Sequence, residues 1–262
     1  MKTGFKNAIK KKLIVSKVMH EENVNGVTYK VIESKCMLPG YKERRALAFF
    51  SEKDKRVYIQ SMIYLNKKYN MQPCMISAQK VIGIWGRNVA VDDMLLLGCA
   101  GSAVARYTAL QFPGSKIKGV EHSPRLIEIA KKYFLLDEIK DEFEIIKADA
   151  FEFVKSEKTL YDVIFVDLFD TERLSQEVYS QSFVANLCRL GKENSVIIFN
   201  MLNEDKEKII KFAKETDRDD IYKKILLSSE GRNNLVLIKK GKGRNLDKVI
   251  KEINENWEAG EI

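Results

Sequence analysis

The run Met94-Leu95-Leu96-Leu97 is followed directly by Gly98-Cys99-Ala100-Gly101-Ser102 and then by a helical pattern. A short apolar run that stops at a glycine turn before a helix is typical of a strand, a tight turn and a helix start. Gly98 permits the turn, and Gly101 lets backbone N–H groups approach a ligand where the helix begins. The stretch therefore predicts the first strand, turn and helix of an α/β sheet.

Three further apolar runs follow, and each ends in an acid. They are 117–120 before Glu121, 143–148 before Asp149, and 161–166 before Asp167. Because the carboxyl ends of parallel strands line one crevice, we expect these acids to share an edge with Gly98. An acid after the second strand can accept hydrogen bonds from ribose hydroxyls, and one after the third can accept the amine of adenine. The ordered set predicts a pocket for an adenosine.

Leu95 to Asn200 resembles the spermidine synthase family of polyamine aminopropyltransferases, which shares the fold of class I S-adenosylmethionine-dependent methyltransferases. The glycine turn carries the resemblance together with four segments: Val120-Glu121-His122-Ser123-Pro124, Ala148-Asp149-Ala150-Phe151-Glu152-Phe153, Tyr161 to Asp170, and Val196 to Asn200. It implies a Rossmann-like α/β sheet of about seven mostly parallel strands, preceded in the sequence by a small N-terminal antiparallel β domain. We expect the β-hairpin domain over 1–62 and the nucleoside-binding domain over 63–262.

The resemblance also implies roles for individual residues. Those expected to contact the nucleoside are Gly98, Cys99, Ala100, Gly101, Glu121, His122, Asp149, Ala150 and Asp167. Asp167 and Asp170 are the expected catalytic acids, because a carboxylate there can accept the proton of an amine nucleophile. Gln60 and Asp170 are expected on the acceptor side. Asp149 and Asp170 could instead act only as helix N-caps, so a purely structural role remains open for both.

Two departures from the family leave the transferred group open. Gly101 stands where the family has an aspartate in its glycine-rich turn, and the family's Asp-Ser-Ser-Asp-Pro loop appears as Asp167-Leu168-Phe169-Asp170-Thr171. The leading expectation is aminopropyl transfer from decarboxylated S-adenosylmethionine to an amine or polyamine. The alternatives are methyl transfer from S-adenosylmethionine to a small molecule, and a non-catalytic protein that binds a nucleoside.

Composition narrows the class of protein. A chain of 262 residues, 45% of them hydrophobic, can bury a full core, and no apolar run is long enough to span a membrane. The basic stretch Met1 to Lys12 does not resemble a secretory signal, so we expect a cytoplasmic protein.

Four dispersed cysteines and two histidines do not form the clusters that bind a metal ion, so we expect no metal site. The net charge of +8 is interleaved with acids, so we expect no nucleic-acid partner; a homodimer is left open.

Hydrophobic patterns outline the remaining elements. Residues 13–60 favour antiparallel strands with turns at Asn25-Gly26 and Pro39-Gly40, and 61–86 favour helix with a break near Pro73. Further helices are predicted over 103–110, 124–136, 176–190, 204–215 and 246–257, and strands over 196–200, 221–228 and 234–239. Ser123 is the expected cap of the helix over 124–136.

Overall fold

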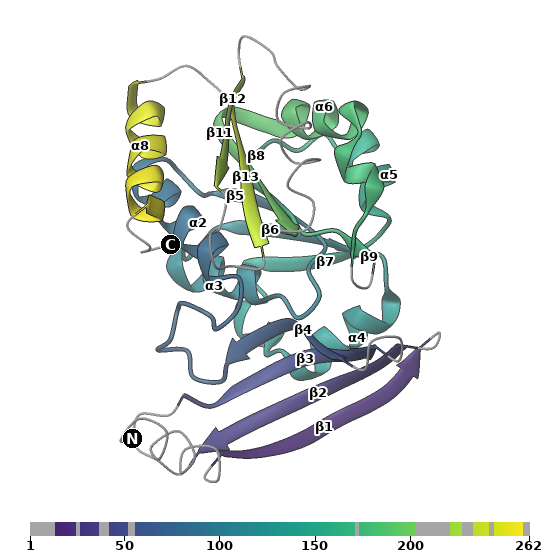
Figure 1. Cartoon of the computed structure of the whole chain (residues 1–262). Coiled ribbons are helices and arrows are strands. Elements are labelled where there is room, and N and C mark those ends of the chain that lie inside the picture. The colour runs from purple at the N-terminus through teal and green to yellow at the C-terminus, as the bar shows by residue number, and fades with distance from the viewer. Residues whose placement is uncertain are drawn as a thin grey trace.

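The computed structural model describes residues 14–24, 27–36, 42–51, 56–170, 173–202, 221–226, 233–240 and 244–258. These residues form a four-stranded sheet, a seven-stranded sheet and a two-stranded pair, with helices packed around the larger sheet (Figure 1). The helix predicted over 204–215 lies outside the described residues, and so does the side chain of Asp170.

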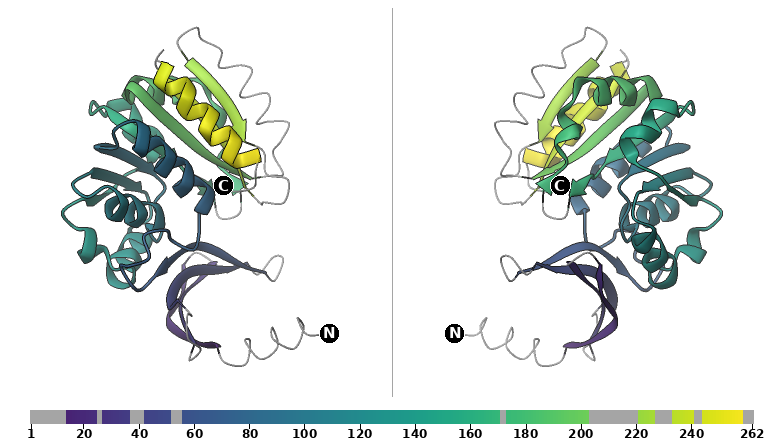
Figure 2. Two further views of the ribbon diagram at one scale, coloured as in Figure 1. Left: turned by 90° about the vertical axis from the view of Figure 1, so that its left-hand side faces the viewer. Right: turned by 90° about the vertical axis from the view of Figure 1, so that its right-hand side faces the viewer.

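The N-terminal sheet is antiparallel throughout and follows the order of the chain. Its strands are β1 (Ile14–Val24), β2 (Val27–Cys36), β3 (Arg44–Ser51) and β4 (Arg56–Tyr64). Figure 2 shows that this sheet forms its own layer beside the α/β part of the molecule. Val31, Leu47 and Ile63 point to one face and are fully buried. The antiparallel N-terminal sheet predicted from the sequence is confirmed.

The larger sheet has the order β12-β13-β11-β8-β5-β6-β7. Its strands are β5 (Asp93–Leu97), β6 (Lys116–Glu121), β7 (Phe143–Lys147), β8 (Tyr161–Val166), β11 (Gly191–Leu202), β12 (Ile221–Leu226) and β13 (Asn233–Lys240). All neighbours from β11 to β7 pair in parallel, and β13 is antiparallel to both of its neighbours. The predicted seven-stranded, mostly parallel sheet is confirmed. The strand order reverses at β5, where open α/β sheets bind ligands.

Helices cover both faces of this sheet. One face carries α2 (Ile76–Asn88), α3 (Ala103–Gln111) and α8 (Arg244–Glu258), and the other carries α5 (Ala150–Ser156) and α6 (Gln181–Leu190). The remaining elements are α4 (Pro124–Tyr133), the 3-10 turns η1 (Leu136–Ile139) and η2 (Gln176–Tyr179), and the short pair β9 (Phe169–Asp170) and β10 (Arg173–Leu174). No helix among the described residues has the length and apolar character needed to cross a membrane.

A hydrophobic cluster, separate from those on the two faces of the larger sheet, joins the N-terminal sheet to the α/β part. The N-terminal sheet contributes Val31, Leu47 and Ile63, and the α/β part contributes Ala103, Leu126, Ile129 and Phe134. Helix α4 supplies Leu126 and Ile129, so this helix is the main support of the N-terminal sheet. Burial of these side chains stabilises the contact, at roughly 25 cal/mol for each Å² of apolar surface removed from water.

Three predicted helices differ from the structure, and the one predicted over 124–136 ends earlier, at Tyr133. The helix predicted over 61–86 is wrong in its first part, because 61–64 continue β4 and a regular helix begins only at Ile76. Ser61 and Ile63 are both buried while Met62 and Tyr64 are only partly so, which is the alternation of a strand. The helix predicted over 176–190 is divided at Ser180, which accepts a hydrogen bond from the Phe183 N–H and caps α6.

Candidate active site at the ends of β5 and β8

The turn after β5 touches the end of β8 through the backbone. Gly98 has a φ of +79°, and a Cβ built on it would lie 2.3 Å from the carbonyl oxygen of Asp167. The Gly98 N–H donates to the Val120 carbonyl at 2.9 Å, and the Asp167 N–H donates to the Leu97 carbonyl at 2.8 Å. Only glycine fits this position, because any side chain would meet both a left-handed backbone and a clash.

A cavity opens at this point, between the glycine turn and the N-terminal sheet. It encloses about 310 Å³, part of it open to solvent. Its lining residues come from both parts of the chain: Gln60, Ser61, Met75, Leu96, Gly98, Cys99, Ala100, Ser102, Ala103, Val104, Ala105, Phe165 and Asp167. The structure therefore brings together five of the residues predicted for the site, including Gln60 and Asp167.

Asp167 is the acidic side chain in this lining. Burial raises its pKa to about 6; a hydrogen bond from Asn200 opposes this shift, and the negative charge of Glu121 adds to it. The Asn200 Nδ2 donates to Asp167 Oδ1 at 2.7 Å, and the same nitrogen lies 3.6 Å from the sulfur of Met75. A carboxyl group with this pKa can take up and release a proton near neutral pH.

Glu121 ends β6 and is 6% exposed. Its Oε1 accepts the Ser123 N–H at 3.0 Å, and its Oε2 accepts the Ala100 N–H at 3.3 Å. Burial alone would raise the pKa of Glu121, but the interaction with His122 and the two backbone hydrogen bonds outweigh it and lower the pKa. This carboxylate stays charged at neutral pH and connects the glycine turn with the start of α4.

Gly101 serves the packing of the two sheets. A Cβ built on it would lie 2.7 Å from Ser61 Cβ on β4 and 2.9 Å from Phe134 Cε1. Glycine at this position therefore lets the N-terminal sheet approach the turn. The predicted contact of Gly101 with a ligand stays a prediction.

Among the predicted site residues whose side chains the structure describes, Asp149, Ala150 and His122 also lie outside the cavity lining. Asp149 is exposed, and its side chain accepts the Glu152 N–H at 2.9 Å, so it caps α5. Ala150, the first residue of that helix, is buried in the core, and His122 is exposed with its Nδ1 3.3 Å from Glu121 Oε1. Glu121 pairs with Lys147 in the sheet, so Asp149 still follows on the same edge. Their contacts with a nucleoside, and the role of Asp170, stay predictions.

Cys99 is buried, and burial together with the charge of Glu121 raises the pKa of its thiol. A thiol that stays protonated is a poor nucleophile, so Cys99 contributes shape to the cavity. Within the described part of the chain, no three His, Cys, Asp or Glu side chains gather closely enough to hold a metal ion.

Sequence reasoning missed most of the cavity lining together with Asn200, and three of the missed residues make contacts that shape the site. Asn200 contacts Asp167, Met75 contacts Asn200, and Ser61 packs on Gly101. Asn200 carried a signal, because it is a polar residue within the otherwise apolar run Val196 to Leu202. Met75 and Ser61 carried none, because their roles depend on the placement of the N-terminal sheet.

Comparisons with known proteins agree with this geometry. Residues 94–217 match the model of the spermine/spermidine synthase domain. The polyamine aminopropyltransferase of Chromobacterium violaceum is 29% identical over 113 residues, which is 43% of this chain and 43% of the relative. The chain thus matches less than half the length of this curated relative.

Solved structures extend the likeness to nearly the whole chain. A probable spermidine synthase from Corynebacterium glutamicum has a TM-score of 0.64 at 14% identity, covering 90% of this chain and 87% of its own. A spermidine synthase in complex with the transition-state analogue AdoDATO has a TM-score of 0.59 at 17% identity, covering 89% and 76%. At these identities the likeness establishes the fold, including the N-terminal sheet. The predicted resemblance to the spermidine synthase family is confirmed over residues 94–217, which match the model of its spermine/spermidine synthase domain.

Proposed function

We propose that this protein transfers an aminopropyl group from decarboxylated S-adenosylmethionine to an amine. The observation that carries the proposal is the position of Asp167, a carboxyl group with a pKa of about 6 in a cavity shared by the glycine turn and Gln60. The aminopropyltransferases that match residues in this part of the chain support the same reaction.

The reaction requires the protein mainly to orient the donor and the amine and to remove a proton from the amine. The amine nitrogen attacks the carbon next to the sulfonium sulfur, a C–N bond forms, and the C–S bond breaks with its electron pair returning to sulfur. Methylthioadenosine leaves. Asp167 attracts the cationic amine and takes up the proton that it loses, and its raised pKa makes it a stronger base than an ordinary aspartate.

The residues present fit a nucleoside at the edge beside this cavity. Each Glu121 oxygen accepts one backbone N–H, and a carboxylate has about four lone-pair sites, so acceptor capacity remains for ribose hydroxyls. We propose Glu121 as the ribose contact and Asp149 as the adenine contact.

Methyl transfer from S-adenosylmethionine remains the second candidate. The absence of an aspartate at Gly101 and the apolar Leu168-Phe169 in the Asp167 loop favour it, because both depart from the family pattern. An amine acceptor needs the base at Asp167, whereas an acceptor activated elsewhere does not.

One experiment separates the candidates. The protein is incubated with each sulfonium donor and a panel of amines, diamines and polyamines, and products are identified by mass spectrometry. Methylthioadenosine together with an aminopropylated amine supports the proposal, whereas S-adenosylhomocysteine supports the methyltransferase. With neither product, a thermal shift by methylthioadenosine identifies a binding protein, since a ligand at 100 times its dissociation constant adds roughly 2.7 kcal/mol to the folded state.

We further propose a cytoplasmic location. The cysteines Cys74 and Cys99, which form no disulfide among the described residues, support it, because reduced thiols persist in a reducing compartment. The homodimer left open by the sequence stays a prediction.

A further inference from the structure

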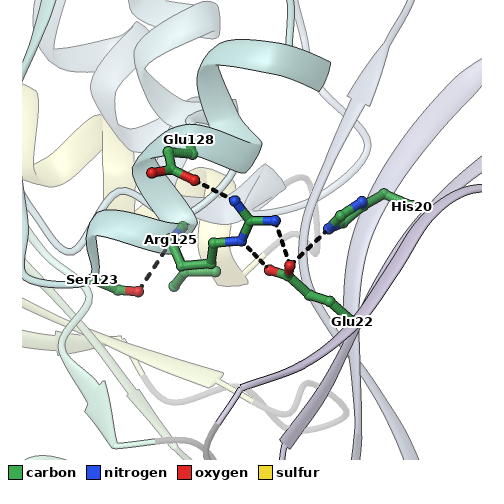
Figure 3. Close-up of polar contacts among 6 residues, drawn as sticks. His20, Glu22, Ser123, Arg125 and Glu128 are labelled. Carbon is green, nitrogen blue, oxygen red and sulfur yellow. Dashed lines mark hydrogen bonds and ion pairs between the residues drawn. The ribbon is translucent and has the colours of Figure 1, made fainter.

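The N-terminal sheet is joined to the first turn of α4 by a pair of opposite charges (Figure 3). Glu22 on β1 faces Arg125, whose Nε donates to Glu22 Oε1 at 2.5 Å and whose Nη2 donates to Glu22 Oε2. The remaining guanidinium nitrogen, Nη1, bonds Glu128 within α4, and His20 Nε2 lies 3.3 Å from Glu22 Oε2. Two parallel bonds from a rigid guanidinium fix both the distance and the angle between partners.

The other end of α4 is held by the same sheet. Arg45 on β3 donates to the carbonyl of Tyr133, the last residue of the helix, and its Nε bonds Glu33 at 3.2 Å. The Tyr133 ring also lies 5.5 Å from the ring of His20. Helix α4 is therefore fixed to the N-terminal sheet at both ends.

The first turn of α4 in turn holds Glu121. Ser123 caps the helix by accepting the Leu126 N–H at 3.2 Å, and its own N–H donates to Glu121 Oε1 at 3.0 Å. The other oxygen of Glu121 bonds the Ala100 N–H of the glycine turn. A displacement at the start of α4 would move one of the two backbone donors that orient this carboxylate.

We propose that Glu22 and Arg125 are positioning residues for the nucleoside side of the site. Through α4, the N-terminal sheet would set the orientation of Glu121, in addition to supplying Gln60 on the acceptor side. This inference rests on the proposed function, in which Glu121 contacts the ribose.

The exposure of the pair indicates what kind of effect to expect. The Arg125 side chain is 41% exposed and the Glu22 side chain 19%, and an ion pair with a solvent-exposed partner contributes little to the free energy of unfolding. The hydrogen bond from Arg125 lowers the pKa of Glu22, so the pair is charged at neutral pH. Its loss should therefore affect the geometry of the site more than the stability of the fold.

The test compares Glu22→Gln with Glu128→Gln. Both variants remove a carboxylate from the same guanidinium, but only the first lies across the interface, so the second is a matched control. Hydrogen exchange without ligand should become faster over 98–102 and 121–127 in Glu22→Gln and stay unchanged in Glu128→Gln. Equal exchange in the two variants would overturn the proposal.

A second measurement, of ligand affinity, tests whether the pair affects the site. By calorimetry, Glu22→Gln should lower the affinity for methylthioadenosine about fivefold with a nearly unchanged melting temperature. Adding Arg125→Gln should cause little further loss, because the two residues act through one contact. A lower melting temperature with unchanged affinity would mean that the pair is only structural. Wild-type protein that binds no methylthioadenosine would count against the proposed function, and the exchange comparison would still decide the positioning role.

Discussion

Glu121 and Asp167 end two strands of the same sheet, yet their surroundings shift the pKa in opposite directions. Burial acts to raise the pKa of both carboxyl groups. Glu121 has two backbone donors and His122 around it, and its pKa falls below the usual value. Asp167 has a side-chain bond from Asn200, and its pKa rises to about 6.

The difference follows from the groups around each acid, because His122 and two backbone donors together offset burial at Glu121, whereas the bond from Asn200 does not offset it at Asp167. A carboxylate that is always ionised suits the binding of hydroxyl groups, whereas one that titrates near neutral pH suits proton transfer. The same edge of the sheet thus provides a binding acid and a base, and substitutions at the two positions should have effects of different kinds.

The largest expected effect is on turnover. Asp167→Asn keeps the shape and removes the base, so we expect a loss on the order of 10² to 10⁴ in single-turnover rate for an amine acceptor. The wild-type rate should rise as the pH passes about 6, where Asp167 loses its proton, and the variant should lack this step. Rates within threefold of each other across the pH range would assign Asp167 a structural role.

The second effect concerns stability and has the opposite sign from most substitutions. The raised pKa of Asp167 means that its ionisation destabilises the fold, fully above pH 6 and not at all below its ordinary value of 3.8. Asp167→Asn should therefore raise the free energy of unfolding by about 3 kcal/mol at pH 8 and leave it unchanged near pH 3. Urea unfolding at both pH values measures this, and an equal difference at the two would contradict the titration.

Substitution of Glu121 should lower the stability of the fold, whereas substitution of Asp167 should raise it. Glu121→Gln removes a charged acceptor, so affinity for methylthioadenosine should fall about tenfold by calorimetry. Because its folded pKa is lowered, Glu121 stabilises the fold above its ordinary value of 4.5, and this contribution disappears as the pH falls through the folded pKa. The variant should accordingly be less stable than wild type at pH 7. Unchanged affinity would remove Glu121 from the ribose contact.

The smallest effect is expected at Asp149, the exposed acid on the same edge. Asp149→Asn keeps the cap of α5, since Asn and Asp cap helices equally well, and should change the free energy of unfolding by less than about 0.5 kcal/mol. Affinity for methylthioadenosine should fall, but less than in Glu121→Gln. An affinity identical to wild type would leave Asp149 with the capping role alone.

The sequence predicts the frame of the site well because local patterns determine it. The apolar runs before Glu121 and Asp167 are long enough to identify strands, and Gly98 identifies the turn between strand and helix. Parallel pairing then places the strand ends on one edge without further information.

The environment of each acid depends on contacts distant in sequence. Asn200 lies 33 positions from Asp167, and Ser61 lies 40 positions before Gly101, so neither partner follows from a local pattern. The same reason explains the error at 61–64, where pairing with β3 overrides a helical spacing of apolar residues. The opposite pKa shifts of Glu121 and Asp167 could not be read from their positions in the sequence alone.

The hydrophobic cluster shared by the two sheets has a consequence for how the chain folds. Val31, Leu47 and Ile63 find apolar partners on α3, α4 and Phe134, so the N-terminal sheet shares part of its core with the α/β part. Synthesised separately, either part would present this surface to water and be prone to aggregate. We therefore expect the two layers to unfold in a single cooperative transition, with the N-terminal sheet completing its structure only after the chain has been extended through α4.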